Sequence, residues 1–325
     1  MIETKLMERR EIAVSATGKT GISPGKLKFN SLLDKFVPQE KVGTALPHKV
    51  VMNRRLVKLD AAFAEFLEYT APSIETEARL DCLKGIGCTA ADVEQFSIVL
   101  AKYRERSDFE KYSGLFLSAM MNTSKDTEFV IPTGHLGVKI SYIGYRNNGK
   151  KIRIAGRAGH YIGELMKNGE ITVEGDAGEC VGREMHGGII IVKGNTGDYV
   201  GYQMGGGRTV VEGNVQDSAG EMMKGGIIVV KGNARRFVGR RMENGRIDVK
   251  GGIDSYSGWN MKGGKINVLG SAGQEPGFAM EGGIIRIMGK ISFVTDRFKK
   301  GEIWQNGKLL AADGKVVGIL NEGME

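Results

Sequence analysis

The sequence VGREMHGGIIIVKGN at residues 181–195 contains the pattern that decides the fold. Close copies read AGEMMKGGIIVVKGN at 219–233 and VGRRMENGRIDVKGG at 238–252. Each copy centres on a methionine, with glycine three residues before it and three and nine residues after it. The methionines recur at a strict spacing of 19 residues, at Met166, Met185, Met204, Met223, Met242, Met261 and Met280. A fixed period of this length is typical of a stack of similar coils.

Each coil contains one short stretch in which apolar and polar residues alternate. Side chains two residues apart on a strand share a face, so the apolar residues five and seven positions after each methionine point inward together. These pairs are Ile171/Val173, Ile190/Val192, Ile228/Val230, Ile247/Val249, Ile266/Val268 and Ile285/Ile287. We therefore expect a mainly β fold, a right-handed, single-stranded β-helix of about seven to eight coils, with each methionine filling the space between coils.

The repeated glycines have a structural role in such a coil. A chain that returns to its starting point in every repeat must bend sharply, and glycine adopts positive φ at little cost. Asn or Asp often stands ten residues after the methionine, and these residues are expected to support left-handed turns. The residues concerned are Asp176, Asn195, Asn214 and Asn233.

The rest of the chain divides into three further regions. Residues 1–50 have no clear periodicity and predict an irregular or partly extended lead-in, whereas 51–128 predict a helical domain of about four helices. One of these helices begins after Thr89, a suitable N-cap with Asp92 three residues on. The β-helix occupies 129–295, and residues 296–325 predict a C-terminal hairpin cap around Asn306-Gly307. The helical domain is expected to close the other end of the rod, since open sheet edges need covering.

Composition and charge restrict the class of protein. The net charge of +8 is spread evenly over both halves of the chain, so no basic arm or stripe indicates nucleic-acid binding. Three cysteines without a CxxC pair are typical of a reducing compartment, and we expect a cytoplasmic protein. The sequence shows neither a secretory signal nor a stretch of 18 apolar residues, so no membrane span is expected.

The repeats resemble a known family. Phrases of the type GxxMxGGxIxVxG mark the Gly-repeat β-helix shared by the C-terminal domain of the glutamate synthase large subunit and one of the subunits of formylmethanofuran dehydrogenase. The resemblance covers residues 144–289. It implies a non-catalytic scaffold subunit that binds no cofactor itself, while partner subunits carry flavin, iron–sulfur or molybdopterin/tungstopterin groups. The cysteine nucleophile, flavin barrel and iron–sulfur motif of glutamate synthase have no counterpart here, where the second residue is Ile2.

Two sets of residues are candidates for docking a partner subunit or a second copy of the chain. Guanidinium groups attract carboxylates, and four arginines fall within one coil, at Arg235, Arg236, Arg240 and Arg241. The alternative is a solvated corner balanced by acids such as Glu221 and Glu243. Outward strand positions are unusually apolar at Ile189, Ile191, Val210, Ile227 and Val229, which predicts an exposed stripe. Here the alternative is that the helical domain folds back over the stripe.

We predict no catalytic, cofactor-binding or metal-binding residues. The loop Gly205-Gly206-Gly207-Arg208 is the best place for a phosphate, but coil corners explain its glycines without a ligand. Cys180 is expected to pack, with a reactive thiol as the alternative. His48, His135, His160 and His186 have no ligand-type spacing.

Two other functions remain open alternatives. A stand-alone hydrolase of esters or amides would use Cys180 or His186. Nucleic-acid binding would use the segment LKGIGCTAADVEQF at 83–96, which resembles a helix-hairpin-helix with Lys84 and Gly85 at its turn. The acids that follow the turn, Asp92 and Glu94, disfavour a phosphate there.

Overall fold

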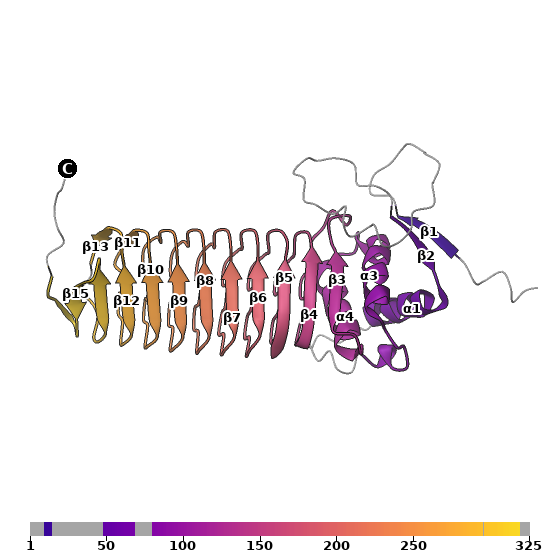
Figure 1. The fold of residues 1–325 in the computed structure, drawn as a ribbon, viewed down its shortest axis with the longest axis horizontal. Coiled ribbons are helices and arrows are strands. Elements are labelled where there is room, and N and C mark those ends of the chain that lie inside the picture. The colour runs from indigo at the N-terminus through magenta and orange to yellow at the C-terminus, as the bar shows by residue number, and fades with distance from the viewer. Residues whose placement is uncertain (1–9, 15–47, 69–79, 295, 319–325) are drawn as a thin grey trace, which may run out of the picture.

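The computed structural model describes residues 10–14, 48–68, 80–294 and 296–318. The protein is a straight rod with a helical region at the N-terminal end (Figure 1). Most of the predicted lead-in lies outside the described residues, as do residues 69–79 of the predicted helical domain. The described part of the lead-in includes strand β1 (Arg10–Val14), which pairs in antiparallel fashion with β2 (His48–Met52).

The rod is a β-solenoid of about nine turns of ~19 residues each, which confirms the predicted β-helix and exceeds the expected seven to eight coils. Each turn contributes one strand to a parallel stack (Figure 1). The strands are β3 (Glu128–Pro132), β4 (Asn148–Ala155), β5 (Asn168–Val173), β6 (Ile189–Val192), β7 (Arg208–Val211), β8 (Ile227–Val230), β9 (Arg246–Val249), β10 (Lys265–Val268), β12 (Ile284–Ile287) and β14 (Glu302–Gln305). Two shorter strands, β11 (Ala272–Gln274) and β13 (Ile291–Phe293), form a second parallel pair.

The coil count was too low because the first turns, although they lie within the predicted range 129–295, lack the methionine phrase. Asn147 stands 19 residues before Met166 and is fully buried in the place of a methionine. Its amide group is satisfied locally, since its Nδ2 donates to the Lys150 carbonyl at 2.8 Å and its Oδ1 accepts from the Lys150 N–H at 3.0 Å. A polar residue can occupy this core position because the turn that follows it supplies both hydrogen-bond partners.

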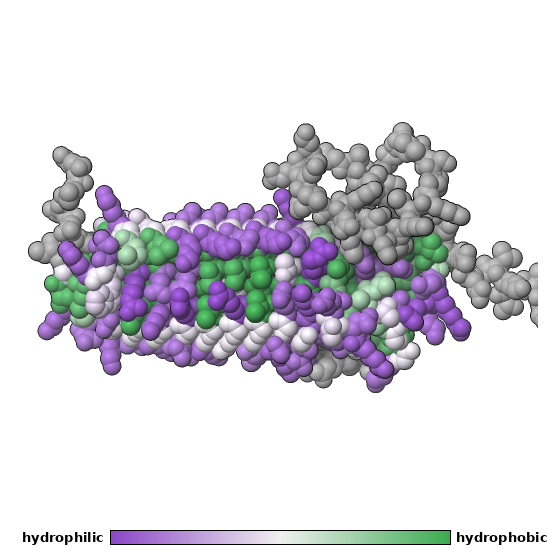
Figure 2. Space-filling model, in the orientation of Figure 1, coloured by the Kyte–Doolittle hydropathy of each residue, from purple (hydrophilic) through white to green (hydrophobic). Residues whose placement is uncertain are grey.

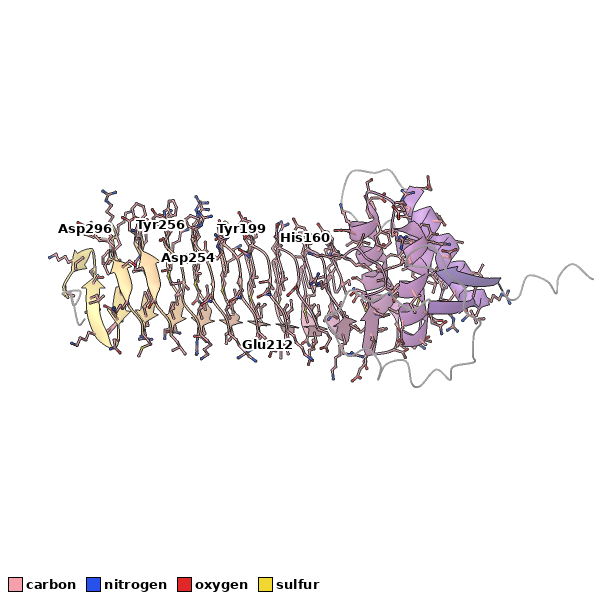
Figure 3. All side chains as sticks on the ribbon, turned by 90° about the horizontal axis from the view of Figure 1, so that it is seen from above. His160, Tyr199, Glu212, Asp254, Tyr256 and Asp296 are labelled. Atoms are coloured by element: carbon pink, nitrogen blue, oxygen red, sulfur yellow. The ribbon has the colours of Figure 1, made fainter. Side chains whose placement is uncertain are left out.

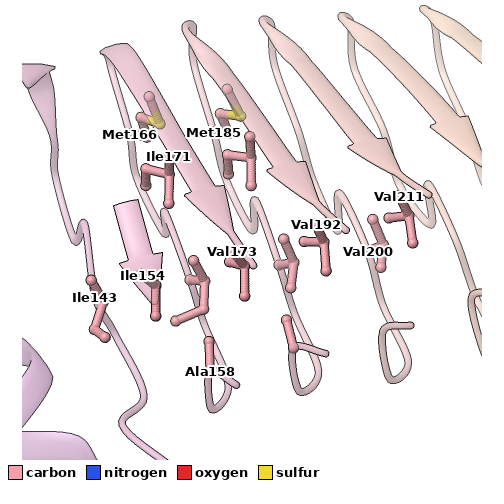
Figure 4. Close-up of a cluster of buried hydrophobic side chains, with 14 of the residues drawn as sticks. Ile143, Ile154, Ala158, Met166, Ile171, Val173, Met185, Val192, Val200 and Val211 are labelled. Carbon is pink, nitrogen blue, oxygen red and sulfur yellow. The ribbon is translucent and has the colours of Figure 1, made fainter. Parts of the chain in front are cut away.

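The methionine column is the core of the rod. All seven repeated methionines have 0% exposure, as do almost all of the inward Ile and Val residues. Figure 4 shows Met166 and Met185 at the same position of successive coils, beside the inward Ile171. Each methionine also packs beneath the next coil: a Cβ added to Gly188 would lie 2.5 Å from the Met166 Cε. The flexible thioether therefore fills space that the glycine leaves open.

The left-handed corners confirm one expectation and correct another. The glycine three residues after each methionine has positive φ, for example +85° at Gly226. The Asn and Asp residues ten positions after the methionine are not left-handed, contrary to the prediction. Left-handed backbone occurs instead in two other sets of equivalent residues, those five before and those one before each methionine. Examples are Cys180 (φ 59°) and Glu184 (φ 51°).

The Asn and Asp residues instead form a ladder along the rod. The N–H of Asn195 donates to Asp176 Oδ1 at 2.8 Å, and Asn214 and Gly252 donate in the same way to the Asn one coil before them. Each side chain thus accepts an amide hydrogen from the following coil. A short polar side chain is required here as an inter-coil acceptor and not as a turn former.

The helical region contains three α-helices among the described residues, α1 (Arg54–Glu68), α3 (Ala90–Val99) and α4 (Phe109–Thr123). The predicted N-cap is confirmed, because Thr89 and Asp92 form a reciprocal capping box. About four helices were expected, but between α1 and α3 the described residues contain only a 3₁₀ helix at Leu80–Leu83. The helix after Thr89 also tightens to a 3₁₀ helix at Leu100–Tyr103.

Helix α4 closes the N-terminal end of the rod through one face. Ser118 Oγ donates to the Tyr142 carbonyl at 2.9 Å and accepts from the Gly144 N–H at 2.9 Å, while Asn122 Nδ2 donates to the Tyr145 carbonyl at 3.1 Å. Backbone groups at the end of the stack are thereby satisfied by helix side chains. Gly114 lies on the same face one turn earlier, and it allows this close approach.

Gly114→Ala is expected to lower the free energy of unfolding by about 2 kcal/mol or more. In most helix interiors a Gly→Ala change raises the free energy of unfolding by about 1 kcal/mol, so the effect expected here has the opposite sign. The reason is steric, because a Cβ at Gly114 would lie 1.7 Å from the Ser141 carbonyl oxygen. Urea unfolding followed by circular dichroism measures the effect. Ser113→Ala, next to it in α4, is the control, and a Gly114→Ala variant more stable than the wild type would contradict this packing.

The C-terminal end is closed by the predicted hairpin. Strand β14 turns through Asn306 (φ 46°) and Gly307 (φ 76°) into the antiparallel β15 (Lys308–Ala312). These two positive values fit the Asn-Gly signal that predicted the turn. A second turn at Asp313-Gly314 leads to the short strand β16 (Lys315–Val316), which forms the edge of the 12-stranded sheet.

Candidate functional site

The four predicted arginines lie in the coil between β8 and β9, and the corner that carries them is called the arginine corner. Arg235 and Arg236 come before the left-handed Phe237, and Arg240 and Arg241 come after Gly239. Arg236 donates from two nitrogens to Asp217 Oδ2, at 2.7 and 3.2 Å. Partial burial would raise the pKa of Asp217, but these hydrogen bonds outweigh it and hold the pKa below its ordinary value.

The remaining arginines differ in how much of their charge is balanced within the chain. Arg235 donates to Gln216 Oε1 at 3.1 Å and lies 3.8 Å from Asp254 Oδ2, and its side chain is 56% exposed. Arg240 lies 3.6 Å from the buried Glu221, whereas Arg241 is exposed. The predicted balancing by Glu221 is therefore present for Arg240. Arg235 and Arg241 are the members of the cluster best placed to reach a partner.

The sequence did not predict that Arg240 lies against two aromatic rings. Its guanidinium carbon lies 5.7 Å from the ring centre of Phe237 and 5.3 Å from that of Trp259. Arg183, three coils earlier, has the same environment, with Tyr161 at 5.7 Å and Tyr202 at 5.8 Å. Cations over aromatic faces are attracted by the ring quadrupole.

Each of these arginines also pairs with a buried carboxylate of the preceding coil. Arg183 lies 3.5 Å from Glu164, as Arg240 does from Glu221 at 3.6 Å. Burial raises the pKa of Glu164, and Arg183 offsets part of that effect. The signal was available in the column two residues before each methionine, which reads Glu164, Arg183, Tyr202, Glu221, Arg240, Trp259 and Phe278. The order acid, arginine, aromatic thus occurs twice in the first six of these coils.

Aromatic side chains continue along the same corner of the rod. Tyr142 and Tyr161 stack at 4.7 Å, and Phe237 and Tyr256 at 5.7 Å. Figure 3 shows Tyr199 and Tyr256 along the edge opposite Glu212, which lies on the strand side. Left-handed backbone costs roughly 1–2 kcal/mol at such residues. Stacking between coils and inter-coil hydrogen bonds, such as Tyr161 N–H to the Glu179 carbonyl at 2.9 Å, offset that strain.

The predicted apolar stripe lies on the outer face of the sheet. Ile191, Val210 and Val229 are in register on β6, β7 and β8. Ile189 and Ile227 occupy a neighbouring column on either side of Arg208, and Ile189 is 40% exposed. Figure 2 shows the stripe as a hydrophobic patch over the central strands, with hydrophilic surface on both sides.

The described helices do not fold back over this stripe. They pack against β3 and β4 at the N-terminal end of the rod, several coils away from β7 (Figure 1). Val229 is the most covered member of the stripe, at 9% exposure, and Ile191, Val210 and Ile227 are half-buried. The stripe is thus a shallow apolar surface on the strand face, opposite the aromatic corner.

Three of the four backbone amides in the glycine loop at 205–208 are hydrogen-bonded to the preceding coil. The N–H groups of Gly205 and Gly206 donate to the Met185 carbonyl at 2.8 and 3.1 Å, and that of Arg208 donates to Gly188 at 2.9 Å. A phosphate cradle needs such groups turned toward a ligand. Here they join one coil to the next, which supports the interpretation of these glycines as coil corners.

Cys180 and the histidines occupy different columns of the rod. Burial raises the pKa of the partly buried Cys180 thiol to about 11. The His160 Nδ1 accepts the Glu179 N–H at 3.1 Å, which adds this histidine to the inter-coil acceptors, and the His186 side chain is exposed. Among the described residues no three His, Cys, Asp or Glu side chains are grouped as a metal site would require. The side chain of His48 lies outside the described residues.

Cys180 is expected to react with iodoacetamide at pH 8 about a hundredfold more slowly in the folded chain than in the urea-unfolded chain. The thiolate is the reactive form, and the raised pKa of about 11 leaves little of it at that pH. Peptide-resolved mass spectrometry separates Cys180 from the other two cysteines. The rate should keep rising until the pH passes the folded pKa. A rate constant equal to that of the unfolded chain would restore Cys180 as a candidate nucleophile.

The turn at Lys84-Gly85 precedes the N-terminus of α3, where carboxylates of the chain itself occupy the backbone amides. Gly85 has φ +77° and open space around it. The first amides of α3 are taken by carboxylates, since Thr89 N–H donates to Asp92 Oδ2 at 2.8 Å and Ala90 N–H donates to Asp126 Oδ2 at 2.6 Å. Two acids at this position would repel a nucleic-acid phosphate.

The comparisons with known proteins add no family assignment. Neither a protein-family model nor a curated protein matches the sequence. Within the described part of the chain, every helix is too short or too polar to cross a membrane.

Proposed function

We propose that this chain is a non-catalytic scaffold subunit of a cytoplasmic multi-subunit oxidoreductase or amidotransferase complex, of the glutamate synthase or formylmethanofuran dehydrogenase type. The observation that carries the proposal is a long β-helix whose repeated residues are all used for coiling, while two of its faces expose groups suited to protein contacts. The resemblance of the repeat phrase to the Gly-repeat β-helix supports the type of complex.

The arginine corner supplies the first docking surface. Arg235 and Arg241 expose guanidinium groups, and the neighbouring Arg236 side chain is 51% exposed although it is paired with Asp217. A guanidinium group has five N–H donors, so one internal partner leaves others for a second carboxylate. Arginine and aromatic residues are also enriched at protein interfaces. This corner suits an acidic surface of a catalytic subunit.

The apolar stripe over β6–β8 supplies the second docking surface, for a protein chain with a flat apolar face. In this arrangement the chemistry belongs to the partners: flavin, iron–sulfur or molybdopterin/tungstopterin groups are carried by the catalytic subunits. The rod holds those subunits at fixed positions, because its coils are joined by hydrogen bonds along their whole length.

Affinity purification of the tagged chain from its native source tests the proposal. We expect it to recover an enzyme subunit that carries one of these cofactors, identified by mass spectrometry and visible absorption. The double variant Arg235→Glu, Arg241→Glu should lose that subunit, whereas Lys224→Glu with Lys167→Glu, the same charge change elsewhere, should retain it. Recovery of the chain without any cofactor-bearing enzyme would contradict the proposed function.

A further inference from the structure

A column of alternating charges runs beside the apolar stripe on the outer face of the sheet. It consists of the residues eight positions after each methionine on four successive coils, Glu174, Lys193, Glu212 and Lys231. All four side chains are at least partly exposed, from 21% at Glu174 to 54% at Lys231. Within the chain, Lys193 pairs with Glu174 and Lys231 pairs with Glu212.

The column is complementary in charge to the same column of a second copy whose rod runs in the opposite direction. When a second copy faces the first with its rod running in the opposite direction, a twofold axis can lie between β6 and β7. Lys193 then meets Glu212 of the second copy, and Glu174 meets Lys231 of the second copy. Every position of the column faces the opposite charge, and each contact occurs twice, as the symmetry of a closed dimer requires.

The same axis brings the two apolar stripes together. Ile191 meets Val210 of the second copy at the centre, and Val229 meets Thr172. In the neighbouring column Ile189 meets Arg208 and Ile227 meets Glu170 of the second copy. The methylene groups of these charged side chains can cover the two isoleucines while their charges reach the rim. Because the strands of the two sheets stay aligned, the contact has the geometry of face-to-face sheet packing, about 10 Å apart.

The match is limited to the four central coils. One coil further out, Arg153 meets Asp248 of the second copy, but Lys151 meets Arg246, which has the same sign. The complementary area is therefore small, and we expect a dimer that dissociates on dilution and at high salt.

We propose that the apolar stripe docks a second copy of this chain, with the two rods antiparallel. The four charges also pair within the chain, but their alternation makes this face complementary to a reversed copy of itself, whereas an unrelated partner would need a matching charge pattern of its own. The proposal rests on the scaffold function above and extends it: a dimer places two arginine corners on outward faces, so one assembly holds two catalytic subunits.

Sedimentation equilibrium of the purified full-length chain tests the proposal at about 1–100 µM in low salt. We expect a monomer–dimer equilibrium for the wild type. Lys193→Glu and Glu212→Lys should each weaken dimerisation by about tenfold or more, because each places like charges opposite one another twice. An equimolar mixture of the two variants should dimerise again, since the glutamate introduced in one variant then faces the lysine introduced in the other.

Lys224→Glu is the matched control, because it makes the same charge change at an exposed residue outside this face. It should leave the dimer unchanged, and circular dichroism should show that every variant is folded. A wild type that stays monomeric at about 100 µM would overturn the proposal, as would a dimer that Lys193→Glu leaves intact or a mixture of the variants that stays monomeric. Because the purified chain is tested without partners, failure here leaves the capture of a catalytic subunit as a separate result.

Discussion

Replacing Met223 by alanine is expected to lower the free energy of unfolding by about 2–5 kcal/mol, the range for truncating a large buried side chain. Met223 has 0% exposure and lies in the middle of the methionine column. Its Cε lies beneath the next coil, 2.8 Å from where a Cβ of Gly245 would be. Alanine would leave a gap between two coils that backbone hydrogen bonds hold at a fixed spacing, so the gap cannot close easily.

The neighbouring Met222 provides a control for this substitution. It undergoes the same chemical change to alanine, but its side chain is half-buried at a corner and not in the core. We expect Met222→Ala to cost less than about 1 kcal/mol. Met223→Leu, which conserves volume, should cost less than about 1.5 kcal/mol. Urea unfolding measures all three variants. Equal losses for Met222→Ala and Met223→Ala would contradict the assignment of the core.

The second large effect concerns the left-handed corner after each methionine. Gly226→Ala is expected to cost about 2–4 kcal/mol, from backbone strain together with steric overlap. Gly226 has φ +85°, and a Cβ there would lie 2.9 Å from Gly206 C, from Gly207 O and from Met204 Cε. Two of these three atoms belong to the backbone of the preceding coil, which cannot move without disturbing the stack.

Gly149→Ala separates the two contributions. Gly149 has φ +90°, close to that of Gly226, but nothing lies within 4 Å of its added Cβ. This variant should therefore show the strain alone, roughly 1–2 kcal/mol. The difference between the two variants measures how tightly the coils are packed. If Gly149→Ala cost as much as Gly226→Ala, inter-coil packing would not be the reason for the glycines.

The fold was predictable to the extent that it repeats. Seven registers agree on the positions of methionine and glycine, and six of them on the inward aliphatic pair, so the coil follows from the period. The first turns of the stack were not predictable in this way, because Asn147 replaces methionine and satisfies its own amide. The left-handed columns were also missed, since residues such as Tyr161 and Phe237 have no intrinsic preference for positive φ. Inter-coil hydrogen bonds and ring stacking impose it.

The candidate site was predictable as a set of residues but not as a set of contacts. The stripe was found because its aliphatic residues stand where other coils carry charge. The arginine cluster was found by its density along the chain, which gave no sign that Arg240 lies beside two rings while Arg235 stays more than half exposed. The contact of Arg240 with Trp259 joins residues one coil apart, and it emerges only when the sequence is aligned on its 19-residue period.

The positions of selenium atoms in the selenomethionine protein would test the β-solenoid most directly. In crystals of the selenomethionine protein, an anomalous difference map should show seven peaks in a nearly straight row, spaced about 4.8 Å apart, for the buried methionines of successive coils. If the row were absent, or if its seven peaks were separated by irregular distances, the result would contradict the coil and every role assigned to its faces.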